Sequence, residues 1–218
     1  FRGFDVYWFL HCFKNQLMKK IYSVEGIQTI EKEEFKKLRN SYVLMKRAGT
    51  NCAKKIYKTK LNGKFIVLCG PGNNGGDGLV ISKVLKKLNQ NVILYCLGSN
   101  TYKGDAIIAY TKNRLTKNNY NDLNIPKNSI IIDCIFGIGL KRKVKGIYKK
   151  IIKKVNSSKQ HVISIDIPSG INGNNGKIMC EAIKADNTYT LHAKKIGLTV
   201  NPGMKYSGKI SIIDIGIR

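Results

Sequence analysis

Acidic residues are scarce in this sequence. Only 13 aspartates and glutamates accompany 39 lysines and arginines among 218 residues, which gives a formal net charge of +26. Such a charge raises nucleic acid as a partner. However, the lysines are spread over every predicted helix and loop, together with many asparagines and isoleucines, which is typical of a drift in overall composition. We therefore expect non-specific affinity for polyanions and do not favour nucleic acid as the functional partner.

Long apolar runs are also missing. None approaches the roughly 20 residues that a membrane-spanning helix needs, so no membrane span is expected. Residues 4–13 are apolar and aromatic but short. They are compatible with the end of a targeting segment, and the sequence alone leaves their role open. We interpret residues 1–26 as an N-terminal extension.

Paired metal-binding or disulfide motifs are absent. The six cysteines include no C-x-x-C pair, and the three histidines share no spacing. A disulfide framework and a histidine-based zinc site therefore have little support. We expect buried free thiols and a reducing compartment, either the cytoplasm or an organelle.

Helical and strand patterns alternate along residues 27–218, which we interpret as one domain. Helices are predicted at 27–38, 42–56, 79–88, 103–114 and 147–155, and strands at 64–69, 92–97, 130–134, 161–167, 188–191 and 210–215. Such alternation predicts an α/β fold with a mostly parallel sheet covered on both faces. The lysine- and asparagine-rich stretch 117–128 is predicted to be a solvated loop.

Residues 70–78 read G-P-G-N-N-G-G-D-G and lie between a predicted strand and a predicted helix. Glycines allow positive φ and a close approach of ligand to main-chain N–H groups. These groups and the helix N-terminus would form an anion site, which we expect at residues 73–76. We expect Asp77 to cap the helix.

The supporting residues of common nucleotide sites do not accompany this loop. Rossmann dehydrogenases carry an acid after the second strand, but here that strand ends in Y-C-L-G at residues 95–98. No Lys-Ser or Lys-Thr pair follows the glycines, which excludes a P-loop. The sequence thus has a nucleotide-type loop of another class.

Two carboxylates follow buried strands. Asp133 ends the I-I-I-D run and Asp166 ends the V-I-S-I-D run. Because the carboxyl ends of parallel strands share one edge of the sheet, we expect both acids to face the glycine loop across one crevice. An acid at a strand tip is as often a cap or loop anchor, but two together favour function.

These three runs, in this order, closely resemble the YjeF N-terminal domain family from about residue 27 to 218. The resemblance implies a Rossmann-like three-layer αβα sandwich, usually a homodimer. It also implies an isomerase, NAD(P)H-hydrate epimerase, which interconverts the R and S epimers of NADHX or NADPHX so that a partner dehydratase can repair them. Lys46 departs from the family, which more often carries an acid at this place in its L-M-x-x-A-G motif.

The resemblance also implies the site. The residues that it implies in substrate contact are Asn73, Asn74, Gly75, Gly76, Asp77, Gly137, Ile138, Gly139, Leu140, Lys141, Arg142, Lys143 and Asp166. A potassium ion would be held by Asn74, Asp133 and Ser169, whose oxygens are hard ligands. We interpret Asp133 as the principal acid/base and Asp166 as the second catalytic residue, which positions the substrate. These roles are exchangeable, because a carboxylate bound to a cation stays ionised.

Two further interpretations follow from the charge and the fold. The basic end of the 137–143 loop is expected to favour the extra phosphate of NADPHX. The alternative function is a non-catalytic scaffold or RNA-binding module, since the same fold occurs in an enhancer-of-decapping scaffold protein. The presence of Asn74, Asp133, Asp166 and Ser169 favours the enzyme over the scaffold. A sugar- or nucleotide-transferring enzyme is a third, weaker alternative.

Overall fold

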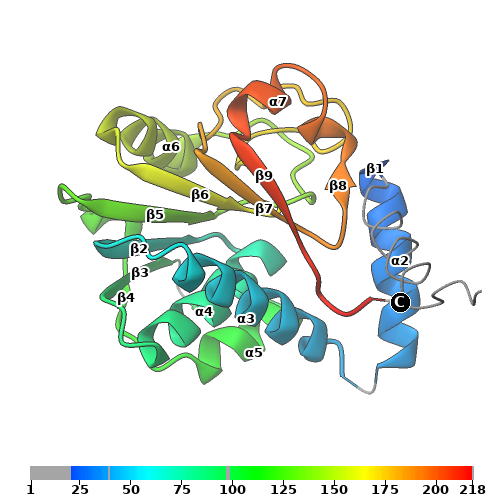
Figure 1. The fold of residues 1–218 in the computed structure, drawn as a ribbon, viewed down its shortest axis with the longest axis horizontal. Helices are drawn as coiled ribbons and strands as arrows, with labels where there is room; N and C mark the ends of the chain where they lie inside the picture. The colour runs from blue at the N-terminus through cyan, green and yellow to red at the C-terminus, as the bar shows by residue number, and fades with distance from the viewer. Residues whose placement is uncertain (1–20, 39, 97–98, 218) are drawn as a thin grey trace, which may run out of the picture.

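The computed structural model describes residues 21–38, 40–96 and 99–217 (Figure 1). The predicted apolar stretch 4–13 and Cys12 lie outside the described residues. The strands are β1 Ile21–Tyr22, β2 Lys64–Cys69, β3 Val92–Cys96, β4 Lys117–Asn118, β5 Ser129–Cys134, β6 His161–Ile165, β7 Asn187–Leu191, β8 Lys194–Lys195 and β9 Lys209–Ile213. The α-helices are α2 Val24–Lys37, α3 Tyr42–Lys58, α4 Asn73–Lys87, α5 Gly104–Lys112, α6 Gly146–Ser158 and α7 Gly203–Tyr206, and the 3₁₀ helices are η1 Ser99–Thr101, η2 Tyr120–Asp122 and η3 Ile196–Leu198.

Seven strands form one central sheet in the order β4-β3-β2-β5-β6-β7-β9. Every neighbouring pair is parallel. The predicted α/β fold with a mostly parallel sheet is therefore confirmed. Within this sheet the chain enters at β2, an inner strand, and runs through β3 to the edge strand β4. It then returns to β5, next to β2, and continues through β6 and β7 to the other edge strand, β9. The reversal between β2 and β5 is the place where such sheets bind ligands.

Helices cover both faces of the sheet and make three layers. Figure 1 shows α3, α4 and α5 on one face and α6 on the other. Alternate residues of β2 explain its unbroken apolar run. Phe65, Val67 and Cys69 pack in the cluster with α3, α4 and α5, whereas Ile66 and Leu68 pack in the cluster with α6. A strand buried on both faces has no polar alternation.

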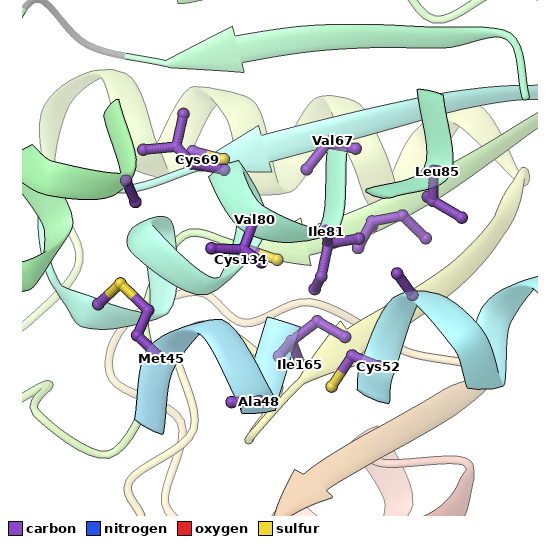
Figure 2. Packing of buried hydrophobic residues seen from close by; sticks show 14 of the residues in the cluster. Met45, Ala48, Cys52, Val67, Cys69, Val80, Ile81, Leu85, Cys134 and Ile165 are labelled. Carbon is purple, nitrogen blue, oxygen red and sulfur yellow. The ribbon is translucent and has the colours of Figure 1, made fainter. Parts of the chain in front are cut away.

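Small residues bring α3 close to α4. Figure 2 shows Met45, Ala48 and Cys52 of α3 on the side that faces the buried side chains of α4 and the sheet. A Cβ atom added to Gly49 would lie 2.5 Å from Cβ of Val80 and 2.9 Å from the carbonyl oxygen of Asp77. The helices therefore touch through backbone at this glycine, and α3 fixes the position of the N-terminal half of α4.

The helix after the glycine loop begins earlier than predicted. It starts at Asn73 rather than at residue 79, and Gly72 is its N-cap residue. The prediction was wrong because glycine and asparagine have low helix propensity, while packing against α3 stabilises the helix here. Two related expectations are also wrong. Asp77 lies inside the helix and is no cap, and the glycines of residues 70–78 do not have positive φ.

The stretch 117–128 is not the solvated loop predicted from its composition. It contains β4 and η2, and Tyr120 and Leu123 are buried. The Tyr120 hydroxyl donates to the carbonyl oxygen of Cys69 at 2.7 Å. These two buried residues anchor a mostly polar segment. The prediction of a solvated loop was wrong because it followed the many lysines and asparagines of the segment and gave no weight to Tyr120 and Leu123.

The start of α2 is held in place by two hydrogen bonds and by the strand that precedes it. Ser23 caps α2 by accepting from the N–H of Gly26 at 3.0 Å. The N–H of Val24 donates to Oδ1 of Asn174 at 2.6 Å. The preceding strand β1 pairs in parallel with β8. Residues 21–26 thus contribute β1 and the start of α2, and the predicted domain boundary at residue 27 stays a prediction.

Most of the described cysteines are free thiols buried in the protein core. Cys52, Cys69, Cys96 and Cys134 are buried and Cys180 is exposed. The expectation of buried free thiols holds for the first four and not for Cys180. Among the described residues, no helix has the length and apolar character needed to cross a bilayer.

Candidate active site

A cavity of about 570 Å³ lies at the carboxyl edge of the sheet. Its walls come from the N-terminus of α4, the loop after β5, the turn after β6, and α2. The predicted substrate residues that line it are Asn73, Asn74, Asp77, Gly137, Ile138, Gly139, Leu140, Lys141, Arg142 and Asp166. The structure thus brings ten residues of the predicted set into one cavity, which is larger than a nicotinamide ring needs.

The other predicted residues lie behind or beside this cavity. A Cβ on Gly75 would lie 1.8 Å from the carbonyl oxygen of Gly70, and a Cβ on Gly76 would lie 2.6 Å from Cε of Met45. These glycines are needed for close packing under the cavity wall. Lys143 lines a second cavity of about 690 Å³. Asp133 and Ser169 are fully buried and do not line the first cavity.

Asp133 ties three segments together. Its Oδ2 accepts from Oγ of Ser164 at 2.8 Å and from the N–H of Ser169 at 2.9 Å. Its Oδ1 accepts from Oγ of Ser169 at 2.5 Å and from the N–H of Ile135 at 3.2 Å. Burial raises the pKa of the Asp133 carboxyl, and these hydrogen bonds oppose that rise. The carboxylate thus holds the tip of β5 to β6 and to the turn after it.

Asp166 faces the cavity and forms an ion pair with Lys195. Asp166 has a φ of +70°, a left-handed conformation that bends the chain away from β6. Its Oδ1 accepts from Nζ of Lys195, and its Oδ2 accepts from the N–H of Ile138 at 3.3 Å. Asp166 is 6% exposed and Lys195 is 0% exposed. A buried pair of this kind is stable only when both partners are well bonded.

Lys195 is fully satisfied in this arrangement. Besides Asp166, its ammonium group donates to Oγ1 of Thr190 at 3.1 Å and to the carbonyl oxygen of Leu191 at 2.8 Å. All three donors of the group are therefore used. These bonds fix the Lys195 side chain beneath Asp166, and the Asp166 carboxylate is held in one orientation toward the cavity.

Two more acids share the neighbourhood of this ion pair. Burial raises the pKa of Asp77 well above its usual range, and the negative charges of Asp166 and Glu31 raise it further. Burial also raises the pKa of Glu31 from 4.5 to about 7, with Asp166 adding to the rise and Lys195 opposing it. Asp77 and Glu31 therefore keep their protons to a higher pH than free carboxyl groups do.

Asn74 is a buried polar side chain without a hydrogen-bond partner among the described residues. It is 7% exposed and lines the cavity, yet neither its amide nitrogen nor its amide oxygen has a hydrogen-bond partner. Buried amides without partners are rare and unfavourable. In the first turn of α4, this side chain is therefore available to a ligand or a cation. The main-chain N–H groups of that turn add a partial positive charge.

Two residues of the site were not singled out from the sequence. Glu31 lies in the predicted helix 27–38, and Lys195 lies within the residues that resemble the family, but neither was assigned a role. Glu31 gave a weak signal, since it is one of two acids, with Glu34, on the apolar side of that helix. Lys195 gave none, because one buried lysine among so many lysines and arginines has no distinctive pattern.

The second cavity continues from the first. The two share Pro71, Phe136, Leu140 and Arg142 as walls. The second cavity also contains Lys143, Lys145 and the N-terminus of α6 at Gly146. Tyr148 borders it, stacks edge-on against Phe136 with ring centroids 4.8 Å apart, and has a buried hydroxyl without a partner. The combination of aromatic rings and positive charge suits an elongated, phosphate-bearing ligand.

A parallel α/β sheet that ends in a cavity bordered by a glycine-rich helix N-terminus and buried acids is the arrangement in which α/β proteins of the Rossmann-like class bind their ligands. The family model described as YjeF-related protein N-terminus matches residues 41–197. The chain therefore belongs to this family.

Curated relatives cover most of the chain. It is 38% identical over 188 residues to an NAD(P)H-hydrate epimerase of Lentilactobacillus buchneri, covering 81% of this chain and 85% of that protein. It is 37% identical over 186 residues to one of Levilactobacillus brevis, covering 80% and 83%. A bifunctional NAD(P)H-hydrate repair enzyme of Coxiella burnetii is 32% identical over 207 residues, which are 92% of this chain and 42% of that protein.

A solved structure agrees with the fold. The crystal structure of yeast ynu0 superposes with a TM-score of 0.72 and 21% sequence identity, covering 88% of this chain and 87% of that chain. At this sequence identity the likeness concerns the fold alone.

Proposed function

We infer that this chain is an NAD(P)H-hydrate epimerase, an isomerase that interconverts the R and S epimers of NADHX and NADPHX. Relatives that carry this name are similar over four fifths of the chain. The observation that carries the inference is the meeting of the Asn73–Asn74 end of α4, the 137–142 loop and Asp166 in one cavity. A scaffold has no need for buried acids and an unpartnered amide at such a place.

The reaction changes the configuration of one carbon, C6 of the hydrated nicotinamide ring. Two routes do this: opening of the ring at the C6–N1 bond, or loss and return of the C6 hydroxyl as water. Both need a group that accepts a proton and a group that donates one. A cavity lined by several carboxyl groups, of which Glu31 and Asp77 have raised pKa values, supports this requirement.

We assign the accepting role to Asp166 rather than to Asp133. Asp166 lines the cavity and forms an ion pair with Lys195. Asp133 lies outside the lining, and both of its oxygens are occupied by hydrogen bonds. Of the two roles that the sequence left exchangeable, this geometry favours proton transfer by Asp166 and a supporting role for Asp133.

Potassium binding by Asn74, Asp133 and Ser169 remains part of the proposal. The unpartnered amide of Asn74 fits a monovalent cation. The oxygens of Asp133 and Ser169 are also hard ligands, but each would exchange a present hydrogen bond for the ion. Ser169 bonds to the N–H of Phe136 at 2.8 Å, and a Cβ on the adjacent Gly137 would lie 3.3 Å from Cβ of Asn74. The three residues therefore border the same short segment. The bound ion would supply a fixed positive charge beside the substrate.

The second cavity is our proposed place for the other half of the dinucleotide. Its walls continue those of the first cavity, and Arg142 and Lys143 lie there. These side chains provide positive charge for the extra phosphate of NADPHX. A preference for NADPHX over NADHX would follow from Lys143.

The repair role implies a dehydratase that consumes the epimerised substrate. Bifunctional relatives join two activities in one protein, as their name states. In this chain we propose that the dehydratase acts as a functional partner. A homodimer is also part of the proposal and rests on the family resemblance; sedimentation velocity at micromolar concentration tests it.

The test of the function is equilibration of the purified R and S epimers of NADHX, followed by chromatography with and without the protein. We expect the protein to accelerate an equilibration that is slow in buffer alone. Equal rates with and without protein, in the presence of potassium, would exclude the epimerase function.

A further inference from the structure

The N-terminal helix α2 contributes an acid to the cavity. Glu31 lines the same cavity as Asp77 and Asp166. It belongs to a segment outside the 41–197 range of the family model, and its helix stands beside β8 in Figure 1 rather than on a face of the sheet. The Glu31 side chain is therefore brought to the site by an element separate from those that carry the predicted site residues.

The position of α2 is coupled to the ion pair under the cavity. Strand β1, which leads into α2, pairs with β8 so that Tyr22 lies opposite Lys195. Asn174 binds the start of α2 through Val24 and through Glu25, the latter at 3.0 Å. These contacts fix the helix on the strand that carries Lys195, and they hold Glu31 near the Asp166–Lys195 pair.

The surroundings of Glu31 favour its protonated form. Burial raises the pKa of Glu31, the negative charge of Asp166 adds to the rise, and Lys195 partly opposes it. Lys141 and Arg142 line the same cavity from the loop after β5. Because Lys195 is already paired with Asp166, Glu31 has no close cation of its own among the hydrogen bonds and ion pairs of the described residues. The raised pKa of Glu31, about 7, therefore gives the cavity an acid that can hold a proton near neutral pH, beside Asp166.

We propose that Glu31 is a catalytic residue, the proton donor that works with Asp166 as the proton acceptor. This rests on the proposed epimerase function. Asp166 takes the proton of the C6 hydroxyl, the C6–N1 bond breaks, and its electron pair stays on the ring nitrogen, which takes a proton from Glu31. Rotation about the C5–C6 bond turns the aldehyde. N1 then attacks the other face of the aldehyde carbon C6. In this step N1 gives its proton back to Glu31, and the aldehyde oxygen takes its proton back from Asp166, so no other reactant is consumed.

The test compares Glu31→Gln with Glu33→Gln, a change of an exposed acid on the same helix that does not line the cavity. Epimerisation of NADHX is measured between pH 5.5 and 9, with the spontaneous rate subtracted. For Glu31→Gln we expect a kcat about 100-fold lower and a KM within about threefold. The wild-type kcat should decrease as pH rises through about 7, and this decrease should vanish in Glu31→Gln and persist in Glu33→Gln.

Glu31→Asp supplies a second measure that does not depend on the folding of the first variant. It retains the acid but shortens its reach, so we expect an intermediate kcat with the pH-dependent decrease preserved. A Glu31→Gln kcat within threefold of wild type, or an unchanged pH profile, would overturn the role of Glu31. If wild type itself gave no acceleration, the proposed function would fail instead, and the two outcomes are therefore distinguishable.

Discussion

The ion pair between Asp166 and Lys195 allows a quantitative prediction. Lys195→Met removes the positive charge and leaves the Asp166 carboxylate buried beside Glu31 and Asp77. Removing one partner of a buried ion pair destabilises proteins by about 3–5 kcal/mol. The variant also leaves the carbonyl oxygen of Leu191 and the hydroxyl of Thr190 without their donor. We expect the free energy of unfolding of Lys195→Met to be lower than that of wild type by about this amount.

A double-mutant cycle separates the two contributions. In an Asp166→Asn background the buried Lys195 ammonium is itself left unpaired, so Lys195→Met removes that charge while it loses the bonds to Thr190 and Leu191. The net cost there should be below about 1 kcal/mol, so the coupling energy of the pair is at least about 2 kcal/mol.

The assay is guanidinium unfolding at pH 7.5 of wild type, both single variants and the double variant, followed by circular dichroism. Equal effects of Lys195→Met in the two backgrounds would refute a coupled buried pair. A loss below about 1 kcal/mol in the wild-type background would refute the burial argument as well.

The remaining predictions concern pH, packing and specificity. The folded pKa of Glu31 is raised from 4.5 to about 7, so the folded state binds more protons and its stability decreases as pH rises between these values. Glu31→Gln should therefore gain about 1–3 kcal/mol over wild type at pH 8 and little at pH 4 in guanidinium unfolding. Gly49→Ala should lower the melting temperature, because its Cβ would meet Val80 and cost about 1–3 kcal/mol, whereas Gly26→Ala should not. Lys143→Ala should reduce kcat/KM for NADPHX about tenfold more than for NADHX; equal losses would remove its role in specificity.

The sheet was predictable because its strands are apolar runs bounded by turn residues. The short apolar run at residues 64–69 is typical of a strand buried on both faces. The amphipathic helices predicted between such runs indicate that the strands are parallel, because each helix crosses from one strand to the next. The tips of β5 and β6 were predictable for the same reason, since a charged residue after an apolar run marks the end of the strand.

The start of α4 was not predictable from local sequence. Asn73 to Gly78 reads as a loop by helix propensity. The structure makes it helical because Gly76 and Gly78 allow contact with Met45 of α3 and Cys69 of β2. Those contacts join segments far apart in the chain, and no local pattern reports them.

The acid–base assignment likewise depended on tertiary structure. Asp133 and Asp166 have equivalent places in the sequence, each after a buried strand. Only the fold shows that serine and backbone donors surround one, while the other faces the cavity over Lys195. Burial and neighbours, rather than residue type, separate an anchoring carboxylate from one that can exchange protons.

The central claim is that Asp166 transfers protons in a cavity that accepts hydrated nicotinamide dinucleotides. Its most direct test is the rate at which R- and S-NADHX equilibrate with wild type, with Asp166→Asn and with buffer alone, at pH 7.5 with potassium present. The account predicts acceleration by wild type and a rate close to that of buffer for a folded Asp166→Asn. Undiminished acceleration by Asp166→Asn would contradict it.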